Sequence, residues 1–186
     1  MKQLNEKVAI VTGAGQGIGK GIALCLAKRG VKIVATGRRL EPIEQTIAEI
    51  KELGGDGFAM SCDSADRAKV EEVVKATVDT YGIVDVVVNN AQAIVPSAPV
   101  EETTYENMLK AWESGVIGSL NYMQAAFPYM KEQHEGRIIN FASATGMFGI
   151  AGQLAYGSNK EALRGLTKIA AKEWGQYGIS VSYTHL

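Results

Sequence analysis

Short apolar runs alternate along the chain with longer segments in which apolar side chains recur every three or four residues. The run at residues 83–89 has almost no polar alternation, which is typical of a strand buried on both faces of a parallel sheet. In the segments between the runs, the recurrence of apolar residues every three or four positions is typical of amphipathic helices. Strands are therefore predicted at residues 7–12, 31–36, 58–62, 83–89 and 137–142, and a last one is predicted to begin at 179–181.

Glycine follows most of the predicted helices. Thr103 and Glu106 predict a capping box at the start of the fourth helix, Pro128 is expected to bend or loosen its last turns, and Gly136 is expected to end it. Strand and helix alternate six times with short connections. This predicts a doubly wound α/β fold, a mostly parallel sheet between two layers of helices, in one domain over residues 1–186. The helices are expected at residues 18–29, 43–53, 70–78, 104–131 and 155–177.

Composition narrows the class of protein. The 186 residues carry 19 Lys plus Arg against 20 Asp plus Glu, so we expect no basic surface for nucleic acid or acidic membranes. An apolar share of 46 % is enough for a core, but no apolar run is long enough to cross a bilayer. Residues 1–7 contain no apolar block and are not expected to form a signal peptide. Cys25 and Cys62 predict two buried thiols in a reducing, cytoplasmic compartment.

A glycine-rich turn joins the first predicted strand to the first predicted helix. Residues 12–19 read TGAGQGIG. Such a turn lets the backbone approach a pyrophosphate, whose charge then faces the N–H groups at the start of the helix. The spacing fits T-G-x-x-x-G-x-G and not G-x-G-x-x-G. A purely structural tight turn is the alternative, but the flanking strand and helix favour a dinucleotide site.

The end of the second strand bears on the choice between NAD and NADP. Residues 35–39 read ATGRR, with no carboxylate before Glu41 to bind a ribose 2′-hydroxyl. The guanidinium of Arg38 would suit a 2′-phosphate. A solvated arginine pair is the alternative explanation. We therefore predict NADP as the cofactor and keep NAD as a possibility.

Three polar residues near the end of the chain could transfer a proton. Ser143 follows a predicted strand, and Tyr156 lies four residues before Lys160, so the two share one face of a helix. A free phenol has a pKa of about 10, and a neighbouring ammonium favours its ionised form. Tyr156 could then exchange a proton with a carbonyl or alcohol oxygen that Ser143 holds. Tyr and Lys at this spacing can also be ordinary surface neighbours, but the upstream Ser143 and the glycine-rich turn favour the catalytic interpretation.

The chain resembles the short-chain dehydrogenase/reductase family over residues 7–181. The motifs that carry the resemblance are TGAGQGIG at 12–19, Cys62-Asp63, Asn89-Asn90-Ala91, Ser143 and YGSNK at 156–160. The resemblance implies a Rossmann fold and an enzyme that interconverts an alcohol and a carbonyl. It implies that Tyr156 is the catalytic acid/base and Ser143 the oxygen anchor. Lys160 would bind the nicotinamide ribose hydroxyls and favour the ionised phenol.

The resemblance also implies a set of cofactor-binding residues. Asp63 would meet the adenine ring, and Asn90 and Ala91 would line the adenosine ribose side. Asn89 is expected to be structural and to tie the fourth strand to its neighbours. The full predicted set is Gly13, Gln16, Gly17, Ile18, Arg38, Asp63, Ser64, Asn90, Ala91, Tyr156 and Lys160.

Three features depart from the family pattern. Gln92 stands where a glycine is usual, and Gly115 stands where an Asn often holds a water in a proton relay, so that relay is not carried over. Ser114, a kink or another water site could replace it. The last residues, 181–186, resemble a translated sequencing adapter, so we expect a chain truncated at its C-terminus, with a non-native tail and an incomplete substrate lid.

Several expectations about ligands remain open at this point. The apolar residues Ile94, Val95, Met147, Phe148 and Ile150 favour an alicyclic, acyl or steroid-like substrate, unless they only pack on the core. The alternatives to a general NADP(H)-dependent oxidoreductase are a 3-oxoacyl carrier-protein reductase and a cofactor-binding protein without turnover.

Self-association as a homodimer or homotetramer through the helices at 104–131 and 155–177 is expected. No metal site is expected from His134 and His185.

Overall fold

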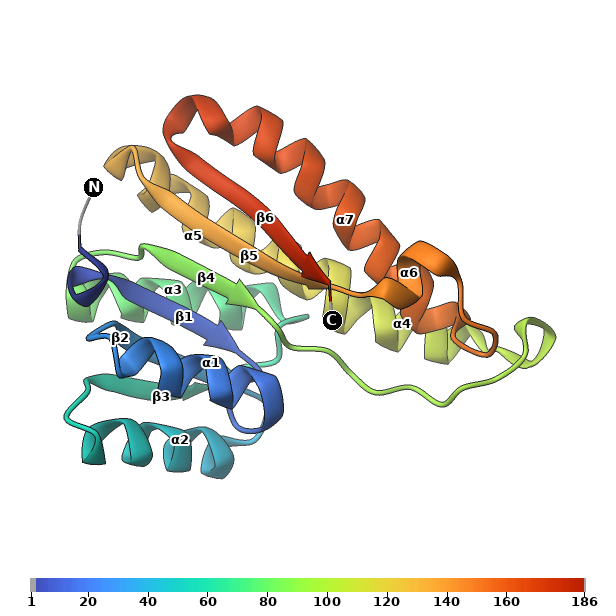
Figure 1. The fold of residues 1–186 in the computed structure, drawn as a ribbon, viewed down its shortest axis with the longest axis horizontal. Coiled ribbons are helices and arrows are strands. Elements are labelled where there is room, and N and C mark those ends of the chain that lie inside the picture. The colour runs from blue at the N-terminus through green and yellow to red at the C-terminus, as the bar shows by residue number, and fades with distance from the viewer. Residues whose placement is uncertain (1–2, 186) are drawn as a thin grey trace.

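A sheet of six parallel strands forms the centre of the computed structural model, which describes residues 3–185 (Figure 1). The strand order is β3-β2-β1-β4-β5-β6, so the winding reverses between β1 and β4. This confirms the predicted doubly wound fold. In such a sheet, ligands bind where the order reverses, at the carboxyl ends of the strands. The strands are β1 (Val8–Thr12), β2 (Lys32–Gly37), β3 (Gly57–Ser61), β4 (Val86–Asn89), β5 (Gly136–Ala142) and β6 (Ile179–His185).

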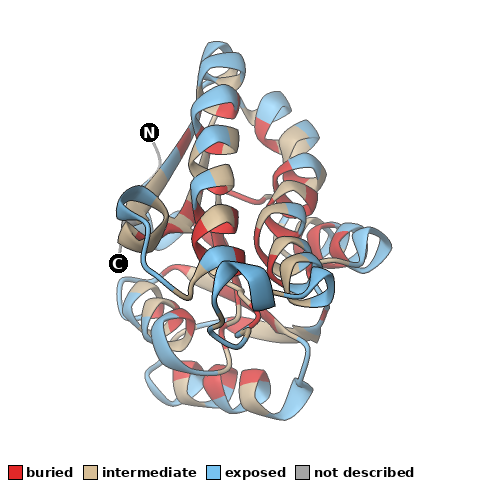
Figure 2. Ribbon diagram, turned by 90° about the vertical axis from the view of Figure 1, so that its right-hand side faces the viewer, coloured by how far each residue is buried: buried red, intermediate tan, exposed pale blue. Residues whose placement is uncertain are grey.

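Helices cover both faces of this sheet. One apolar cluster joins the sheet to α1 and α2, and the other joins it to α3, α5 and α7. Figure 2 shows that the buried residues of the helices lie on their sheet-facing sides. The helices are α1 (Gly17–Ala27), α2 (Leu40–Glu52), α3 (Arg67–Tyr81), α4 (Tyr105–Trp112), α5 (Gly118–Gln133), α6 (Ala144–Phe148) and α7 (Leu154–Trp174), with 3₁₀ turns η1 (Leu4–Glu6), η2 (Val100–Glu102) and η4 (Gly175–Tyr177).

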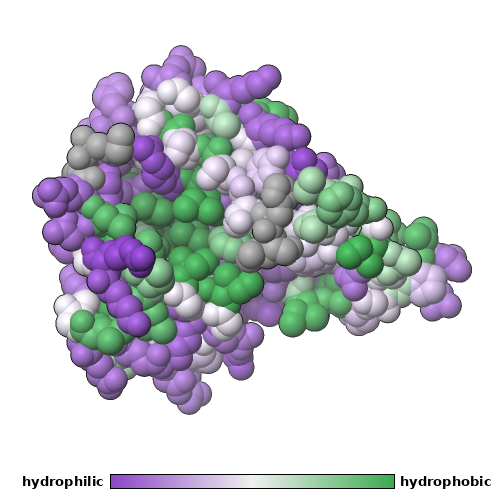
Figure 3. Space-filling view, in the orientation of Figure 1, coloured by the Kyte–Doolittle hydropathy of each residue, from purple (hydrophilic) through white to green (hydrophobic). Residues whose placement is uncertain are grey.

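On the face of the sheet where α1 and α2 pack, these helices cover one half of the sheet. Within the described residues, no helix lies over β5 and β6 on this face (Figure 1). Val86, Ile139 and Phe141 are only partly buried there. Figure 3 shows apolar side chains gathered at the centre of the same view. The sheet therefore presents an apolar half-face to its surroundings.

The predicted helix at 104–131 is interrupted. A π-helical turn, η3 (Glu113–Ile117), separates α4 from α5. The N-cap is Thr104, whose Oγ1 accepts from Asn107 N at 3.2 Å, and the predicted capping box is wrong because Thr103 donates to Pro99 O in the preceding turn.

The C-terminal end of α5 also differs from the prediction. Pro128 lies inside α5, which ends at Gln133. His134 closes the helix in the left-handed conformation, with φ 53°. Gly136 was expected to end this helix but is the first residue of β5.

The structure confirms some of the predictions for single residues and contradicts others. Cys62 is buried as expected, but Cys25 is exposed on α1, where its Sγ accepts from Arg29 Nη1 at 2.8 Å. The expected role of Asn89 in tying neighbouring strands is confirmed, because its Nδ2 donates to Asn140 Oδ1 on β5 at 2.9 Å. In the described part of the chain, no helix is long and apolar enough to cross a membrane. The His, Cys, Asp and Glu residues described there form no group of three that could hold a metal ion.

Candidate active site

A cavity of about 700 Å³ lies at the carboxyl ends of the strands on both sides of the point where the strand order reverses. The segments after β1, β2, β3 and β4 all contribute to its wall. Two of the predicted cofactor residues, Tyr156 and Lys160, lie on α7 and do not line it. The other nine line it together: Gly13, Gln16, Gly17, Ile18, Arg38, Asp63, Ser64, Asn90 and Ala91.

The glycine-rich turn is held tightly against the segment that follows β4. Gly13 and Gly17 adopt φ values of 66° and 55°, a region that favours glycine. Thr12 Oγ1 accepts from the backbone N–H groups of Asn90 and Ala91 at 3.0 and 2.9 Å, and Asn90 Nδ2 donates to Thr12 O at 2.9 Å. The wall of the cavity is therefore built from two loops that brace each other at the start of α1.

Two arginines give one part of this wall a positive charge. Arg38 and Arg39 both line the cavity at the end of β2. Arg39 Nη2 donates to Gln16 Oε1 at 3.0 Å, which connects the arginine segment to the glycine-rich turn. Of these two residues, only Arg38 was predicted from the sequence to bind the cofactor. The contact from Arg39 depends on how β1 and β2 are paired, which no local pattern reports.

One acidic residue of the cavity lies after β3. Asp63 Oδ1 accepts from Ala65 N at 3.0 Å, which fixes the carboxylate in the turn before α3. Ser64 beside it is buried, and its carbonyl accepts from Asn121 Nδ2 on α5 at 2.9 Å. The turn is thus anchored to the helix layer and presents Asp63 to the cavity.

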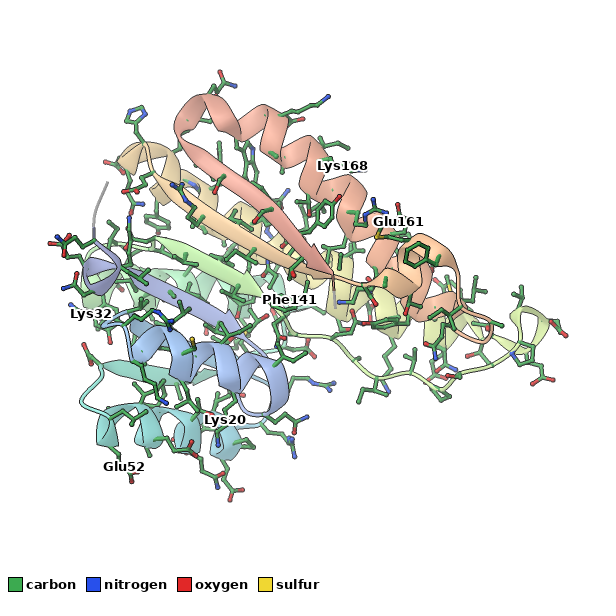
Figure 4. The ribbon with its side chains drawn as sticks, viewed as in Figure 1. Lys20, Lys32, Glu52, Phe141, Glu161 and Lys168 are labelled. Atoms are coloured by element: carbon green, nitrogen blue, oxygen red, sulfur yellow. The ribbon has the colours of Figure 1, made fainter. Side chains whose placement is uncertain are left out.

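The predicted proton-transfer residues lie at the end of β5 and on α7. Lys160 Nζ donates to the carbonyl oxygen of Phe141 at 2.6 Å and lies 5.5 Å from the centroid of the Tyr156 ring. Phe141, which is labelled in Figure 4, lies near the end of β5. Ser143, two residues after Phe141, is buried and caps α6, with its Oγ accepting from Thr145 N at 3.3 Å. The fold therefore brings the amino group of Lys160 to the ring of Tyr156 and to the same strand end as Ser143.

Burial changes the acidity of Lys160. Only 4 % of this residue is exposed, and loss of hydration lowers its pKa to about 8. The folded protein therefore keeps the ammonium form below about pH 8 and loses it above, well before a solvated lysine would. Near neutral pH a positive charge lies beside Tyr156.

The two side-chain departures from the family pattern meet in the structure. A Cβ at Gly115 would lie 2.7 Å from Cγ of Asn159, so the carboxamide of Asn159 takes up the space beside this glycine. Gln92 is the hydrogen-bond partner of that carboxamide. No role for Asn159 was predicted from the sequence. The signal that could have found it is a glycine in a helix interior, where a side chain would otherwise be favoured by about 1 kcal/mol.

Comparison with known proteins decides the family. A family model described as short chain dehydrogenase matches residues 7–185. The chain belongs to the short-chain dehydrogenase family. A 12alpha-hydroxysteroid dehydrogenase from Clostridium sp. (strain ATCC 29733 / VPI C48-50) is 38% identical over 183 residues, which cover 95% of this chain and 70% of the relative. A 3-oxoacyl-[acyl-carrier-protein] reductase from Staphylococcus aureus is 36% identical over 179 residues, covering 95% and 72%.

Solved structures agree with this assignment. The crystal structure of NAD+-bound xylitol dehydrogenase matches with a TM-score of 0.95 and 33% identity, covering 98% of this chain and 70% of that one. This short-chain dehydrogenase is therefore an NAD(P)-dependent oxidoreductase that acts on CH–OH groups. It spans about 70% of the length of the xylitol dehydrogenase and of the hydroxysteroid dehydrogenase.

Proposed function

We propose that this short-chain dehydrogenase interconverts a carbonyl and an alcohol with NADP(H), and that Tyr156 is its general acid/base. The observation that carries the proposal is the buried amino group of Lys160, held between Phe141 O and the face of the Tyr156 ring. A cation fixed there favours the ionised phenol whenever the proton leaves. Burial of a charge is costly, so a buried ammonium at this position supports a role in the reaction.

The residues that line the cavity support a dinucleotide as its ligand. The N–H groups of the glycine-rich turn and of the start of α1 would hold the pyrophosphate, Arg38 the 2′-phosphate and Asp63 the adenine ring. Lys160 would bind ribose hydroxyls. When bound, the nicotinamide supplies or accepts the hydride. Ser143 would hold the substrate oxygen while Tyr156 gives it a proton in reduction or removes one in oxidation.

The proposed preference for NADP over NAD can be tested by substituting Arg38. Arg38→Ala should raise the KM for NADPH about tenfold and leave the KM for NADH within about twofold, because hydrogen bonds to a charged group contribute about 1.5–3 kcal/mol. Steady-state kinetics with both cofactors measure this. Lys51→Ala, which removes an exposed cation on α2, is the control. Equal changes for both cofactors would contradict a 2′-phosphate site at Arg38. Because the similar xylitol dehydrogenase is NAD+-bound, NAD is the alternative cofactor.

The substrate we propose is apolar. Ile94 and Phe148 are 90% and 79% exposed, and Met147 and Ile150 are exposed beside Phe148. Such side chains would suit an alicyclic, acyl or steroid-like carbonyl compound. The similarity to a 3-oxoacyl-[acyl-carrier-protein] reductase supports an acyl thioester as the second candidate. A panel of cyclic ketones and 3-oxoacyl thioesters with NADPH separates the two, and binding of NADPH without turnover on any of them would favour a cofactor-binding protein.

We also propose that the protein forms a homodimer or homotetramer in the cytosol. Leu109 on α4, Ile117 on η3 and Ile169 on α7 are 41%, 40% and 61% exposed, and apolar side chains on these contacting elements would suit a contact between two copies of the chain. Light scattering should therefore give a mass of at least two chains, and a monomer at micromolar concentration would contradict the proposal. The uncovered apolar half-face over β5 and β6 supports a further proposal, that additional elements complete this domain.

A further inference from the structure

Two buried carboxamides connect the wall of the cavity to helix α7. Asn159 is fully buried, three residues after Tyr156 and directly before Lys160. Gln92 lines the cavity in the segment that follows β4. Asn159 Nδ2 donates to Gln92 Oε1 at 2.7 Å. This is a direct link between the helix of the proton-transfer residues and the wall of the dinucleotide cavity.

Backbone groups fix the orientation of both amides. Asn159 Oδ1 accepts from the N–H of Val116 at 3.0 Å, so its Nδ2 must point to Gln92. Gln92 Nε2 donates to the carbonyl oxygen of Ala111 at 3.2 Å, so its Oε1 must point to Asn159. Turning either amide over would face like groups toward each other. The hydrogen bonds therefore form one directed chain from η3 through Asn159 and Gln92 to the end of α4.

The π-helical turn is built around this chain. In η3 the N–H of Gly118 bonds to the carbonyl of Glu113, five residues back, and the N–H of Val116 bonds to Asn159. Gly115 has no side chain, which leaves room for the Asn159 carboxamide. Ser114 Oγ accepts from the N–H of Ala93 at 2.9 Å, so the same turn also holds the residue after Gln92. π-Helical turns occur frequently at functional sites.

We propose that Asn159 and Gln92 are positioning residues that hold the cofactor-side segment after β4 against the helix of Tyr156 and Lys160. This inference rests on the proposed function, because it assigns the pair to the geometry of that reaction. Neither side chain needs to touch the reacting atoms. The rate of an enzyme reaction depends strongly on the relative positions of the cofactor, the substrate and the catalytic side chains. A small displacement of the cavity wall relative to Tyr156 and Lys160 would therefore lower the rate.

The structure also predicts how the two residues depend on each other. Gln92→Met keeps an unbranched side chain of similar length but removes both hydrogen-bonding groups. It leaves Asn159 Nδ2 without its acceptor in a buried place, and Asn159→Ala removes that donor. A buried donor without a partner is costly, and removing both partners is much less so. The two substitutions should therefore be non-additive.

The test is a double-mutant cycle of Gln92→Met, Asn159→Ala and the double variant in the full chain. For each protein, the Kd for NADPH, the kcat and its pH profile, and the Tm are measured. We expect each single variant to raise the Kd for NADPH about tenfold, and the double variant to add less than about twofold to either. Gln124→Met is the matched control, because Gln124 is exposed on α5 and its Oε1 accepts from Arg67 Nη1 at 3.0 Å at the surface. Gln92→Glu is a second variant in case Gln92→Met does not fold, and it should also weaken NADPH binding, since its second carboxylate oxygen would face Ala111 O.

Each outcome decides the inference. Effects of the two substitutions that multiply independently, or a lower Tm with unchanged Kd and unchanged kcat profile, would overturn it. If the wild-type chain binds neither NADPH nor NADH, the proposed function fails, and the cycle in Tm then decides the link alone. Coupled shifts in Tm would support the link between η3, Gln92 and α7, and additive shifts would refute it.

Discussion

Tyr156→Phe is expected to lower kcat for NADPH-dependent carbonyl reduction by about 10²- to 10⁴-fold, the usual contribution of a general acid/base. The substitution removes only the phenolic oxygen. The ring that faces Lys160 Nζ stays, and Tyr156 does not line the cavity, so the Kd for NADPH should change by less than about twofold. Single-turnover absorbance measurements at 340 nm, with NADPH binding measured by fluorescence, separate the chemical step from binding.

A matched tyrosine gives the control for this prediction. Tyr129 is partly buried on α5 and packs against the core on the face that holds α3, α5 and α7, so Tyr129→Phe should leave both kcat and Kd unchanged. Turnover by Tyr156→Phe at the wild-type rate would refute Tyr156 as the acid/base. A loss of NADPH binding equal to the loss of rate would instead assign Tyr156 to the cofactor site.

The charged amino group of Lys160 connects the proton-transfer residues to the end of β5. Its ammonium loses most of its hydration, which is why its pKa falls to about 8. The short hydrogen bond to Phe141 O returns part of the lost solvation and holds the amino group at the end of β5, two residues before Ser143. The end of β5 and helix α7 are thereby joined at the proton-transfer residues.

Local sequence patterns were sufficient for the parallel sheet and for bringing residues to one wall of the cavity. Strands such as β4 are buried on both faces and therefore read as continuous apolar runs. Gly13, Gly17 and Arg38 could be assigned because the chemistry of each is local: a turn with positive φ, a close backbone approach, or a charge at a strand end. Strand ends in a parallel sheet meet at one edge, so these local features converge on one cavity.

The features that could not be predicted depend on contacts between distant segments. The π-helical turn η3 looks like ordinary helical periodicity in the sequence, because apolar residues still recur every three or four positions. What opens it is Asn159, whose Oδ1 accepts the N–H of Val116 from 43 residues away. Likewise Arg39 Nη2 reaches Gln16 Oε1 because β1 and β2 pair in the sheet. Tertiary contacts decide these positions, and no local rule contains them.

Gly19→Ala is expected to weaken NADPH binding by about 100-fold or to abolish it. A Cβ on Gly19 would overlap the Gly13 carbonyl oxygen and lie 2.8 Å from the Gly13 carbonyl carbon. These are backbone atoms of the glycine-rich turn, so the turn itself would have to move, together with the Asn90 side chain that closes it. Overpacking of this kind typically costs about 1–3 kcal/mol of stability, which predicts a Tm lower by about 2–12 °C. Calorimetric titration with NADPH and thermal unfolding measure the two effects.

Gly21→Ala in the same helix separates the geometry of the turn from a general effect of adding a methyl group. Gly21 lies two residues further along α1, and nothing lies within 4 Å of the position that its Cβ would take. Because alanine favours a helix interior over glycine by about 1 kcal/mol, Gly21→Ala should raise the Tm by about 2–4 °C and leave the Kd for NADPH unchanged. Opposite signs at two neighbouring glycines would assign Gly19 to the close approach of α1 to the turn. If Gly19→Ala instead binds NADPH like the wild type, the dinucleotide does not depend on this turn, and the cavity at the ends of β1 and β4 is not its site.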